Sequence, residues 1–250
     1  MKKNADDFIP KTLITDVHSH ILPKMDDGSS GSEESLSMLR QARDANIKAV
    51  IATPHFYAES EKPSDFFLRR EASVNMLKDA MARSGEPFPD IYVGAEVAYF
   101  NGMSCSESLR DLCIDGTKCL LLEMPFYTWT RSVVDEVYDI TKNFGITPYL
   151  AHIERFTEHG NMKYIEELSS RGVVMQSNAD FFIDKKTRKK ALKLTKSGVI
   201  RLLGSDCHDL SDRPQNLGEA IKIICGELSK EYIEMFEAHS ESLLFTANKI

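Results

Sequence analysis

The sequence alternates short apolar runs with longer amphipathic segments, and this rhythm is its strongest constraint on the fold. The apolar runs are rich in β-branched residues and have the length of strands. We predict strands at residues 12–18, 47–53, 90–96, 118–124, 146–152, 172–178 and 199–205. Strands that alternate with helices indicate parallel strands joined by crossover helices, which is an α/β fold.

The amphipathic segments are predicted to be helices. They lie at residues 33–45, 64–84, 105–112, 131–143, 161–171, 185–197, 216–226, 229–237 and 240–248. Ser30 and Glu33 have the spacing of a capping box for the first helix, and Gly145, Gly172 and Gly198 lie where helices should end. No Gly/Ser-rich linker divides the 250 residues, so we predict one domain at residues 12–250 after an N-terminal extension at residues 1–11.

Polar residues follow the predicted strands, beginning with two histidines. His18 and His20 are two residues apart, so on a strand their side chains point the same way and can bind one ion. An Asp26-Asp27-Gly28 turn follows them. In β/α barrels the loops after the strands converge on the active site. We therefore expect this end of the fold to carry the chemistry.

Nine residues at these strand ends are candidate metal ligands. They are His18, His20, Asp27, His55, Glu96, Glu123, His152, Asp206 and His208. A lone histidine at a strand end is commonly a hydrogen-bonded structural residue, and a lone glutamate is commonly solvated. Several carboxylates at one barrel mouth would repel each other unless cations lay among them, which favours metal binding for the set. Nitrogen and carboxylate donors suit Mn²⁺, Fe²⁺ or Zn²⁺, and this many donors imply two or three divalent ions. His159 and His239 lie off the pattern and are predicted to be surface residues.

Composition narrows the class of protein. The net charge of −7 makes nucleic acid an unfavourable partner, and no apolar run approaches the roughly 18 residues of a membrane span. The odd number of cysteines, five, shows no CxxC pair and is typical of reduced thiols in the cytoplasm. The first residues lack the apolar segment of a secretory signal. We expect a soluble cytoplasmic protein of undetermined oligomeric state.

Six motifs in order resemble one known family. They are DxHxHxLPxxDDG from residue 16, TPH at 53–55, GAE at 94–96, LLEMP at 121–125, AHxER at 151–155 and SDxHxxxxRP at 205–214. Together they resemble the PHP (polymerase and histidinol phosphatase) superfamily. Within it they look most like the manganese-dependent bacterial protein-tyrosine phosphatases of capsular and exopolysaccharide operons. The resemblance implies a distorted seven-stranded (β/α)7 TIM-like barrel of the PHP type.

The resemblance also implies roles for residues. It puts His18, His20, Glu96 and Asp206 on one metal, with Glu96 also on a second, and leaves Asp27, His55, Glu123, His152 and His208 for the other two positions. Arg155 and Arg213 match the family's phosphate-binding arginines and, with Asp27, are the candidate catalytic residues. A metal-bridging hydroxide would attack phosphorus. The implied partner is a phosphotyrosine protein, such as the tail of a tyrosine autokinase that controls capsule synthesis.

The sequence also fits other interpretations. Within the superfamily, the alternative is a small-molecule phosphomonoesterase such as histidinol phosphatase. Cys207 and Arg213 fit the CX5R spacing of cysteine-based phosphatases, but the residues between them include two acids and no glycine, which is unsuitable for an anion cradle. A third interpretation, from a different class of protein, is a non-catalytic binding module that kept its metals.

Two aromatic pairs follow candidate ligands. Phe56 with Tyr57 and Phe126 with Tyr127 either flank a phenyl ring or pack loops. The basic run at residues 185–190 is predicted to be a solvated helix face.

Overall fold

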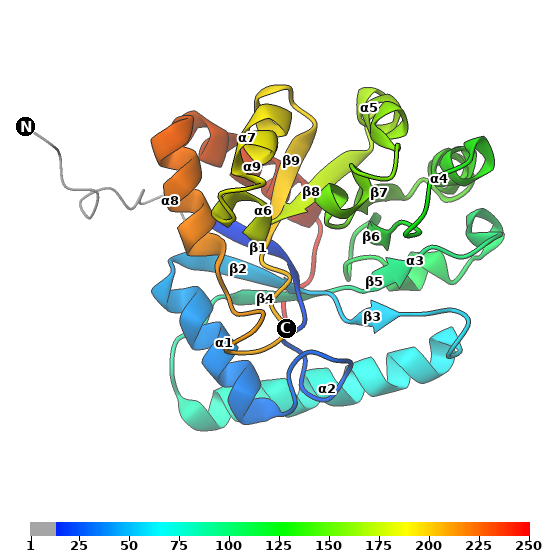
Figure 1. Ribbon diagram of the computed structural model, residues 1–250. Coiled ribbons are helices and arrows are strands. Elements are labelled where there is room, and N and C mark those ends of the chain that lie inside the picture. The colour runs from blue at the N-terminus through cyan, green and yellow to red at the C-terminus, as the bar shows by residue number, and fades with distance from the viewer. Residues whose placement is uncertain (1–13) are drawn as a thin grey trace, which may run out of the picture.

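The computed structural model describes residues 14–250, and its strands form two parallel sheets with helices around them (Figure 1). The first sheet has the order β1-β2-β4, with β1 at Ile14–Ser19, β2 at Ile47–Ala52 and β4 at Asp90–Val93. The second has the order β3-β5-β6-β7-β8-β9. Its strands are β3 (His55–Phe56), β5 (Glu96–Ala98), β6 (Cys119–Glu123), β7 (Thr147–Leu150), β8 (Val174–Asn178) and β9 (Ile200–Gly204). The predicted α/β class with parallel strands is confirmed.

Residues 14–250 contain nine strands instead of seven, because one predicted strand is divided into two and one short strand was not predicted. The prediction at 47–53 corresponds to β2, and the short strand β3 follows it outside the predicted range, after an interruption at Thr53 and Pro54, because Pro54 has no N–H to continue the ladder. The prediction at 90–96 becomes β4 and β5, with Gly94 and Ala95 between them. At both interruptions the chain passes from the first sheet to the second. His55 and Glu96 therefore begin strands rather than end them, and they face each other in the β3–β5 register.

The two sheets also meet at β1 and β9. The amide of Asp206 donates to the carbonyl of His18, and the amide of His20 donates to the carbonyl of Cys207, both at 2.9 Å. These hydrogen bonds hold the segment after β9 beside the end of β1. Residues that are almost two hundred positions apart in sequence are thereby brought together.

Helices cover the outer faces of the strands (Figure 1). They are α1 (Ser32–Asp44), α2 (Pro63–Ser84), α3 (Leu109–Leu112), α4 (Arg131–Phe144), α5 (Met162–Ser170), α6 (Asp180–Ile183), α7 (Arg188–Lys196), α8 (Leu217–Glu227) and α9 (Lys230–Leu244), with short 3₁₀ turns η2 (Met103–Cys105) and η3 (Ile153–Phe156). No helix in residues 14–250 is long and apolar enough to cross a membrane.

The helices differ from the prediction in three places and agree with it at three glycines. The segments 229–237 and 240–248 are one helix, α9, because no glycine or proline interrupts them. The weak candidate at 105–112 is only η2 and α3. The proposed capping box is wrong: the amide and hydroxyl of Ser30 donate to Glu34, not Glu33. Gly145, Gly172 and Gly198 have φ values of 65°, 94° and 75°, which confirms them as helix ends.

The basic run lies only partly on a helix. Residues 184–187 form a turn, and α7 begins at Arg188. Arg188 is not simply solvated, because its guanidinium donates to the carbonyls of Phe182 and Ile183.

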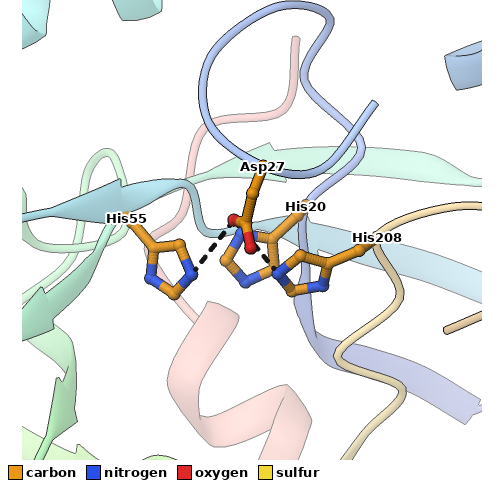
Figure 2. A group of neighbouring side chains, drawn as sticks. All are labelled: His20, Asp27, His55 and His208. Carbon is orange, nitrogen blue, oxygen red and sulfur yellow. Dashed lines mark ion pairs between the residues drawn. The ribbon is translucent and has the colours of Figure 1, made fainter. Parts of the chain in front are cut away.

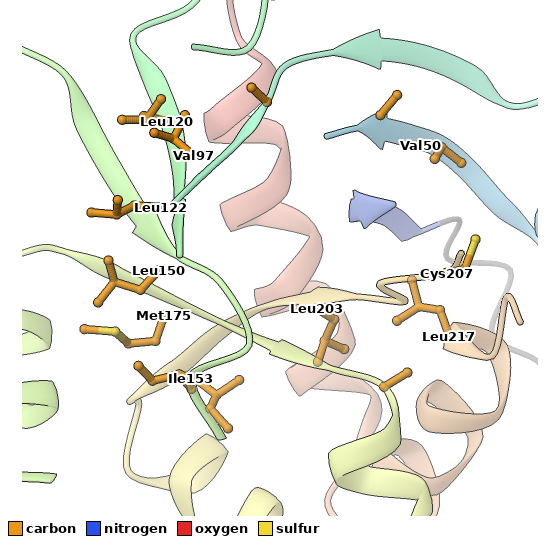
Figure 3. Close-up of a cluster of buried hydrophobic side chains, with 14 of the residues drawn as sticks. Val50, Val97, Leu120, Leu122, Leu150, Ile153, Met175, Leu203, Cys207 and Leu217 are labelled. Atoms are coloured by element: carbon orange, nitrogen blue, oxygen red, sulfur yellow. The ribbon is translucent and has the colours of Figure 1, made fainter. Parts of the chain in front are cut away.

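An apolar interior supports the site. One face of the strands contributes a cluster that includes Val17, Ile51, Leu121, Tyr149 and Leu202. The opposite faces pack against the helices in a larger cluster, part of which Figure 3 shows. Strands buried on both faces are typical of parallel sheets and give the strand ends a rigid base.

Candidate metal centre

Three histidines have one ring nitrogen held by an oxygen acceptor. The pairs are His18 Nδ1 with Gln176 Oε1 at 3.3 Å, His20 Nδ1 with Asp26 Oδ2 at 2.7 Å, and His208 Nδ1 with the carbonyl oxygen of Asp206 at 2.8 Å. Each acceptor takes the N–H of Nδ1, which leaves a lone pair on Nε2. A hydrogen-bonded Nδ1 with a free Nε2 is the usual arrangement of a histidine that binds metal.

The first donor cluster lies at the end of β1. The Nε2 atoms of His18 and His20 are 3.2 Å apart. Glu96 Oε2 lies 3.2 and 3.4 Å from them, and Asp206 Oδ1 lies 3.4 and 3.5 Å from them. Two lone pairs and two carboxylate oxygens thus converge on one point. These electron-rich atoms repel one another, and a cation bound between them would remove that repulsion.

Glu96 joins the first cluster to a second. Its other oxygen, Oε1, lies 2.9 Å from Nε2 of His152, and Glu123 Oε1 lies 3.1 Å from the same nitrogen. The ligand atoms of Glu96, Glu123 and His152 are all within 4.8 Å of one another. Glu96 is almost completely buried and reaches both clusters, so it is positioned to bridge two ions.

The third cluster is nearer the surface. Figure 2 shows Asp27 between His55 and His208, with His20 behind them. Oδ1 of Asp27 lies 3.4 Å from Nε2 of His55 and 3.5 Å from Nε2 of His208. Nε2 of His208 is buried and has no hydrogen-bond partner within residues 14–250. An unsatisfied buried nitrogen costs about 1–3 kcal/mol, a penalty that metal coordination would remove.

Two of these residues have a backbone that most side chains avoid. His152 has φ of 30° and Asp206 has φ of 56°, both in the left-handed region. Such conformations cost on the order of 1–3 kcal/mol and gather at functional sites. Each turns its side chain from the end of a strand into the clusters.

The electrostatics of the site favour positive charge. Burial lowers the pKa of His20, but hydrogen bonds to Asp26 and Glu96 outweigh burial and raise it to about 10. Burial also opposes charge on His152, yet its contacts with Glu123 and Glu96 raise its pKa to about 9. For Glu96 itself, interactions with His18 and His152 outweigh burial and hold the pKa well below its usual range. The same negative field that favours protons on these rings would favour divalent cations.

Two arginines meet at Asp206. Nη2 of Arg155 lies 2.9 Å from Asp206 Oδ2, and Nη2 of Arg213 lies 2.8 Å from the same oxygen. Asn178 donates to it at 2.7 Å. The two arginine side chains are 38% and 37% exposed, so their remaining N–H groups can reach a ligand.

A cavity of about 450 Å³ opens over the clusters. It is lined by Asp27, His55, Tyr57, Glu96, Ala98, Tyr99, Glu123, Met124, Pro125, Phe126, Arg155, Asp206 and Arg213. Of the four aromatic candidates, Tyr57 and Phe126 line it. Phe56 is a core residue, and Tyr127 is exposed outside the lining.

Cys207 does not line this cavity. The residue is 1% exposed and packs in the apolar core with Leu203 and Leu217 (Figure 3). Burial raises the pKa of its thiol further above the usual value, so the reactive thiolate is disfavoured. The cysteine-nucleophile interpretation therefore has no support in the geometry.

Every predicted ligand takes part in the clusters, and the two off-pattern histidines do not. His159 is exposed as expected, whereas His239 is partly buried. Sequence reasoning missed four residues that hold the ligands: Asp16, Asp26, Gln176 and Asn178. The spacing of Gln176 and Asn178, two apart at the end of β8, was the available signal.

Asp16 is the most connected of the missed residues. Its buried carboxylate accepts from the amide and hydroxyl of Ser205 and from Gln215 Nε2, at 2.8, 2.6 and 2.6 Å. It thereby ties β1 to the start and end of the loop that carries Asp206, His208 and Arg213.

The donor sets fit divalent cations, since they combine imidazole nitrogens with carboxylates, include a carboxylate that reaches two clusters, and contain no thiolate. Such a centre can orient and polarise an anionic oxygen ligand. The arginines beside it add bidentate donors for such a ligand.

Comparison with known proteins agrees with this geometry. Residues 14–244 match the family model described as "Capsular polysaccharide synthesis, CpsB/CapC". Tyrosine-protein phosphatase CpsB of Streptococcus agalactiae serotype III (strain NEM316) is 28% identical over 243 residues, covering 92% of this chain and 98% of that protein. Tyrosine-protein phosphatase YwqE of Bacillus subtilis (strain 168) is 29% identical over 237 residues, covering 92% and 91%.

A solved structure is also similar. It comes from work on YwqE of Bacillus subtilis and CpsB of Streptococcus pneumoniae, described as unique metal-dependent tyrosine phosphatases. The TM-score is 0.82 at 26% identity, and the alignment covers 95% of this chain and 96% of that chain.

Proposed function

This chain belongs to the CpsB/CapC family of capsular polysaccharide synthesis, and from that membership and its site we propose that it is a metal-dependent protein-tyrosine phosphatase. The observation that carries the proposal is the position of two arginines against a carboxylate that also faces the histidine pair. An anion bound by Arg155 and Arg213 would therefore lie beside the donor clusters. A phosphoryl group, with its charged non-bridging oxygens, is the ligand that this pairing suits.

We assign the ligands to three positions. His18, His20, Glu96 and Asp206 form the first, and Glu96, Glu123 and His152 form the second. Asp27, His55 and His208 form the third. The three donor clusters support this assignment. We propose Mn²⁺ as the physiological ion, with Fe²⁺ or Zn²⁺ as the alternatives that the donor types also accept.

When bound, divalent cations supply a nucleophilic water at neutral pH and neutralise charge on a phosphoryl group. The residues of the chain bind and orient the phosphoryl group. Arg155 and Arg213 hold the non-bridging oxygens through paired N–H donors, and Asp27, which lines the cavity, is the most exposed member of the third cluster. A phenolate leaving group, with a pKa of about 10, needs less protonation than an alkoxide.

We propose that the substrate is a phosphotyrosine segment of another protein, such as the tail of a tyrosine autokinase in capsule synthesis. The cavity is open at the surface, which suits a side chain presented by a flexible segment. We also propose a cytoplasmic location. All five cysteines, which lie in the described residues, are free thiols, and this suits a reducing compartment.

The finer fold proposal is that the two sheets form one distorted barrel of the PHP type. The hydrogen bonds between the ends of β1 and β9 support it. So does the passage of the chain between sheets from β2 to β3 and from β4 to β5. The single domain at residues 12–250 stays a prediction, and the extension at residues 1–11 lies outside the described residues.

The deciding experiment is phosphate release by metal-stripped protein with and without added Mn²⁺. A phosphotyrosine peptide and histidinol phosphate serve as the two substrates. We expect metal-dependent release that favours the peptide. Release that survives stripping would contradict the metal mechanism, and release from histidinol phosphate alone would identify the small-molecule alternative. Absence of release with Mn²⁺, Fe²⁺ and Zn²⁺ would leave a metal-binding protein without this activity.

A further inference from the structure

We propose that Tyr57 and Phe126 are the two walls of a slot that holds the phenyl ring of the substrate, with Ala98 as its floor. This inference rests on the proposed phosphatase function and adds the residues that select an aryl phosphate. Tyr57, Ala98 and Phe126 all line the cavity above the donor clusters. The slot is therefore adjacent to the position proposed for the phosphate.

The topology sets the width of the slot. Tyr57 directly follows β3 and Phe126 follows β6, while Ala98 ends β5, which lies between those two strands in the sheet. Adjacent strands are roughly 4.8 Å apart, so β3 and β6 are separated by about 10 Å. Stacked aromatic rings have centroids about 4.5–7 Å apart, so walls carried by segments that leave the sheet at about this separation would have room for one ring between them.

Both walls are held in place by histidines of the donor clusters. The ring of Tyr57 stacks on His55 with a centroid distance of 5.3 Å and an interplanar angle of 29°. The ring of Phe126 stacks on His152 at 6.3 Å and 24°. Phe126 also contacts the buried ring of Phe156 at 5.3 Å. Each wall is thus oriented before substrate arrives, which lowers the entropy cost of binding.

The exposure of the walls distinguishes a binding surface from loop packing. Tyr57 is 43% exposed and Phe126 is 54% exposed, although both lie in a concave site. Phe56, beside Tyr57 in sequence, is 1% exposed and fills the core. Aromatic surface that remains open in a polar cavity gains when an apolar ring covers it. An alkyl phosphate would cover much less of it.

The test compares two substrates in the full-length, metal-loaded protein. Hydrolysis of a phosphotyrosine peptide depends on the slot, and hydrolysis of glycerol 2-phosphate, which has no ring, does not. The variants are Tyr57→Ala and Phe126→Leu. Tyr57→Phe keeps the ring, and Tyr127→Ala removes an exposed aromatic residue that does not line the cavity.

We expect each wall variant to lower kcat/KM for the peptide about three- to tenfold, the size of one lost aromatic pair, mainly through a higher KM. For both wall variants, kcat/KM for glycerol 2-phosphate should stay at the wild-type level. The control variants Tyr57→Phe and Tyr127→Ala should have wild-type kcat/KM for each substrate. An equal loss on both substrates would show that the rings only position His55 or His152, and no loss would show that they only pack loops; either result overturns the slot. Wild-type protein that hydrolyses neither substrate would instead overturn the proposed function, and the slot with it.

Discussion

Arg155 donates from Nη2 to Oδ2 of Asp206 across 2.9 Å. The other oxygen of the same carboxylate lies 3.4 Å from Nε2 of His18. One side chain therefore connects the proposed phosphate-binding arginine with the proposed metal centre. Because Asp206 has φ of 56°, its backbone accepts strain to place the carboxylate between the two.

Asp206→Asn should weaken both metal binding and the contact with the arginines. An amide offers one oxygen and one NH₂ group, so it cannot face the histidine pair and the arginines with an acceptor at the same time. We expect metal affinity to fall at least about tenfold and kcat/KM for a phosphotyrosine peptide to fall with it. Metal titration and steady-state kinetics would measure this. Asp212→Asn removes the same charge from the same loop, on an exposed residue, and is the control.

The arginines should affect catalysis without affecting metal content. Arg155→Lys and Arg213→Lys keep the charge but lose the paired N–H donors, so kcat/KM should fall by about tenfold or more. Metal analysis should give the wild-type number of bound ions. Arg171→Lys, an exposed arginine that lies over Tyr138, is the matched control. Wild-type kinetics in both site variants would remove the arginines from the proposed mechanism.

The sequence predicted which side chains come together better than it predicted which residues hold them in place. Histidines and acids after strands stand out because parallel strands bring their ends together. Asp16 and Gln176 also lie on strands at this end of the fold, but their role in holding ligands could not be predicted, since their partners, Gln215 and His18, lie more than 150 positions away. The division of the strands at Pro54 and after Val93 was also missed, because local apolar patterning does not record which sheet a segment joins.

Asp26 is the missed residue with the clearest expected effect. Its Oδ2 accepts from Nδ1 of His20 at 2.7 Å and from the amide of His55 at 2.9 Å. Asp26→Asn should weaken metal binding about 10- to 100-fold, because the charge that orients His20 is lost. Calorimetric titration of stripped protein with Mn²⁺ would measure the affinity. An unchanged affinity would show that Asp26 shapes only the turn.

A surface cluster gives a pH-dependent prediction away from the site. Glu86, in the segment after α2, accepts hydrogen bonds from Arg40 and Arg43 of α1, and these bonds lower its pKa to about 2. A lowered pKa means that the ion pair stabilises the fold above the usual value near 4.5 and loses this contribution as the pH falls toward 2.

Glu86→Gln should therefore have a slightly lower Tm than wild type at pH 7 and the same Tm near pH 2. High salt at pH 7 should shrink the difference, because these side chains are about one-third exposed and ions in the solvent can screen them. Thermal melts across this range would test it, with Glu71→Gln on the exposed face of α2 as control. A difference in Tm that persisted at low pH would mean that the substitution acts through something other than the charge of Glu86.

Gly204 gives a test of how closely the fold packs around the proposed metal ligands. A Cβ at this position would lie 2.6 Å from Cβ of His18 and 2.9 Å from Nε2 of Gln176. Gly204→Ala should displace His18 and Gln176 and disturb the contact between them. Overpacking of this kind costs about 1–3 kcal/mol of stability. Because the displaced residue is a proposed ligand, metal affinity should fall as well.

The control for this substitution is Gly226→Ala in α8, where a Cβ would meet nothing within 4 Å. Alanine is the better helix former by about 1 kcal/mol, so this variant should be at least as stable as wild type and bind metal normally. Denaturant unfolding and Mn²⁺ titration of both variants would separate the two effects. Normal Mn²⁺ affinity in Gly204→Ala would show that His18 can move without loss of the centre, and the first ligand position would then need to be reassigned.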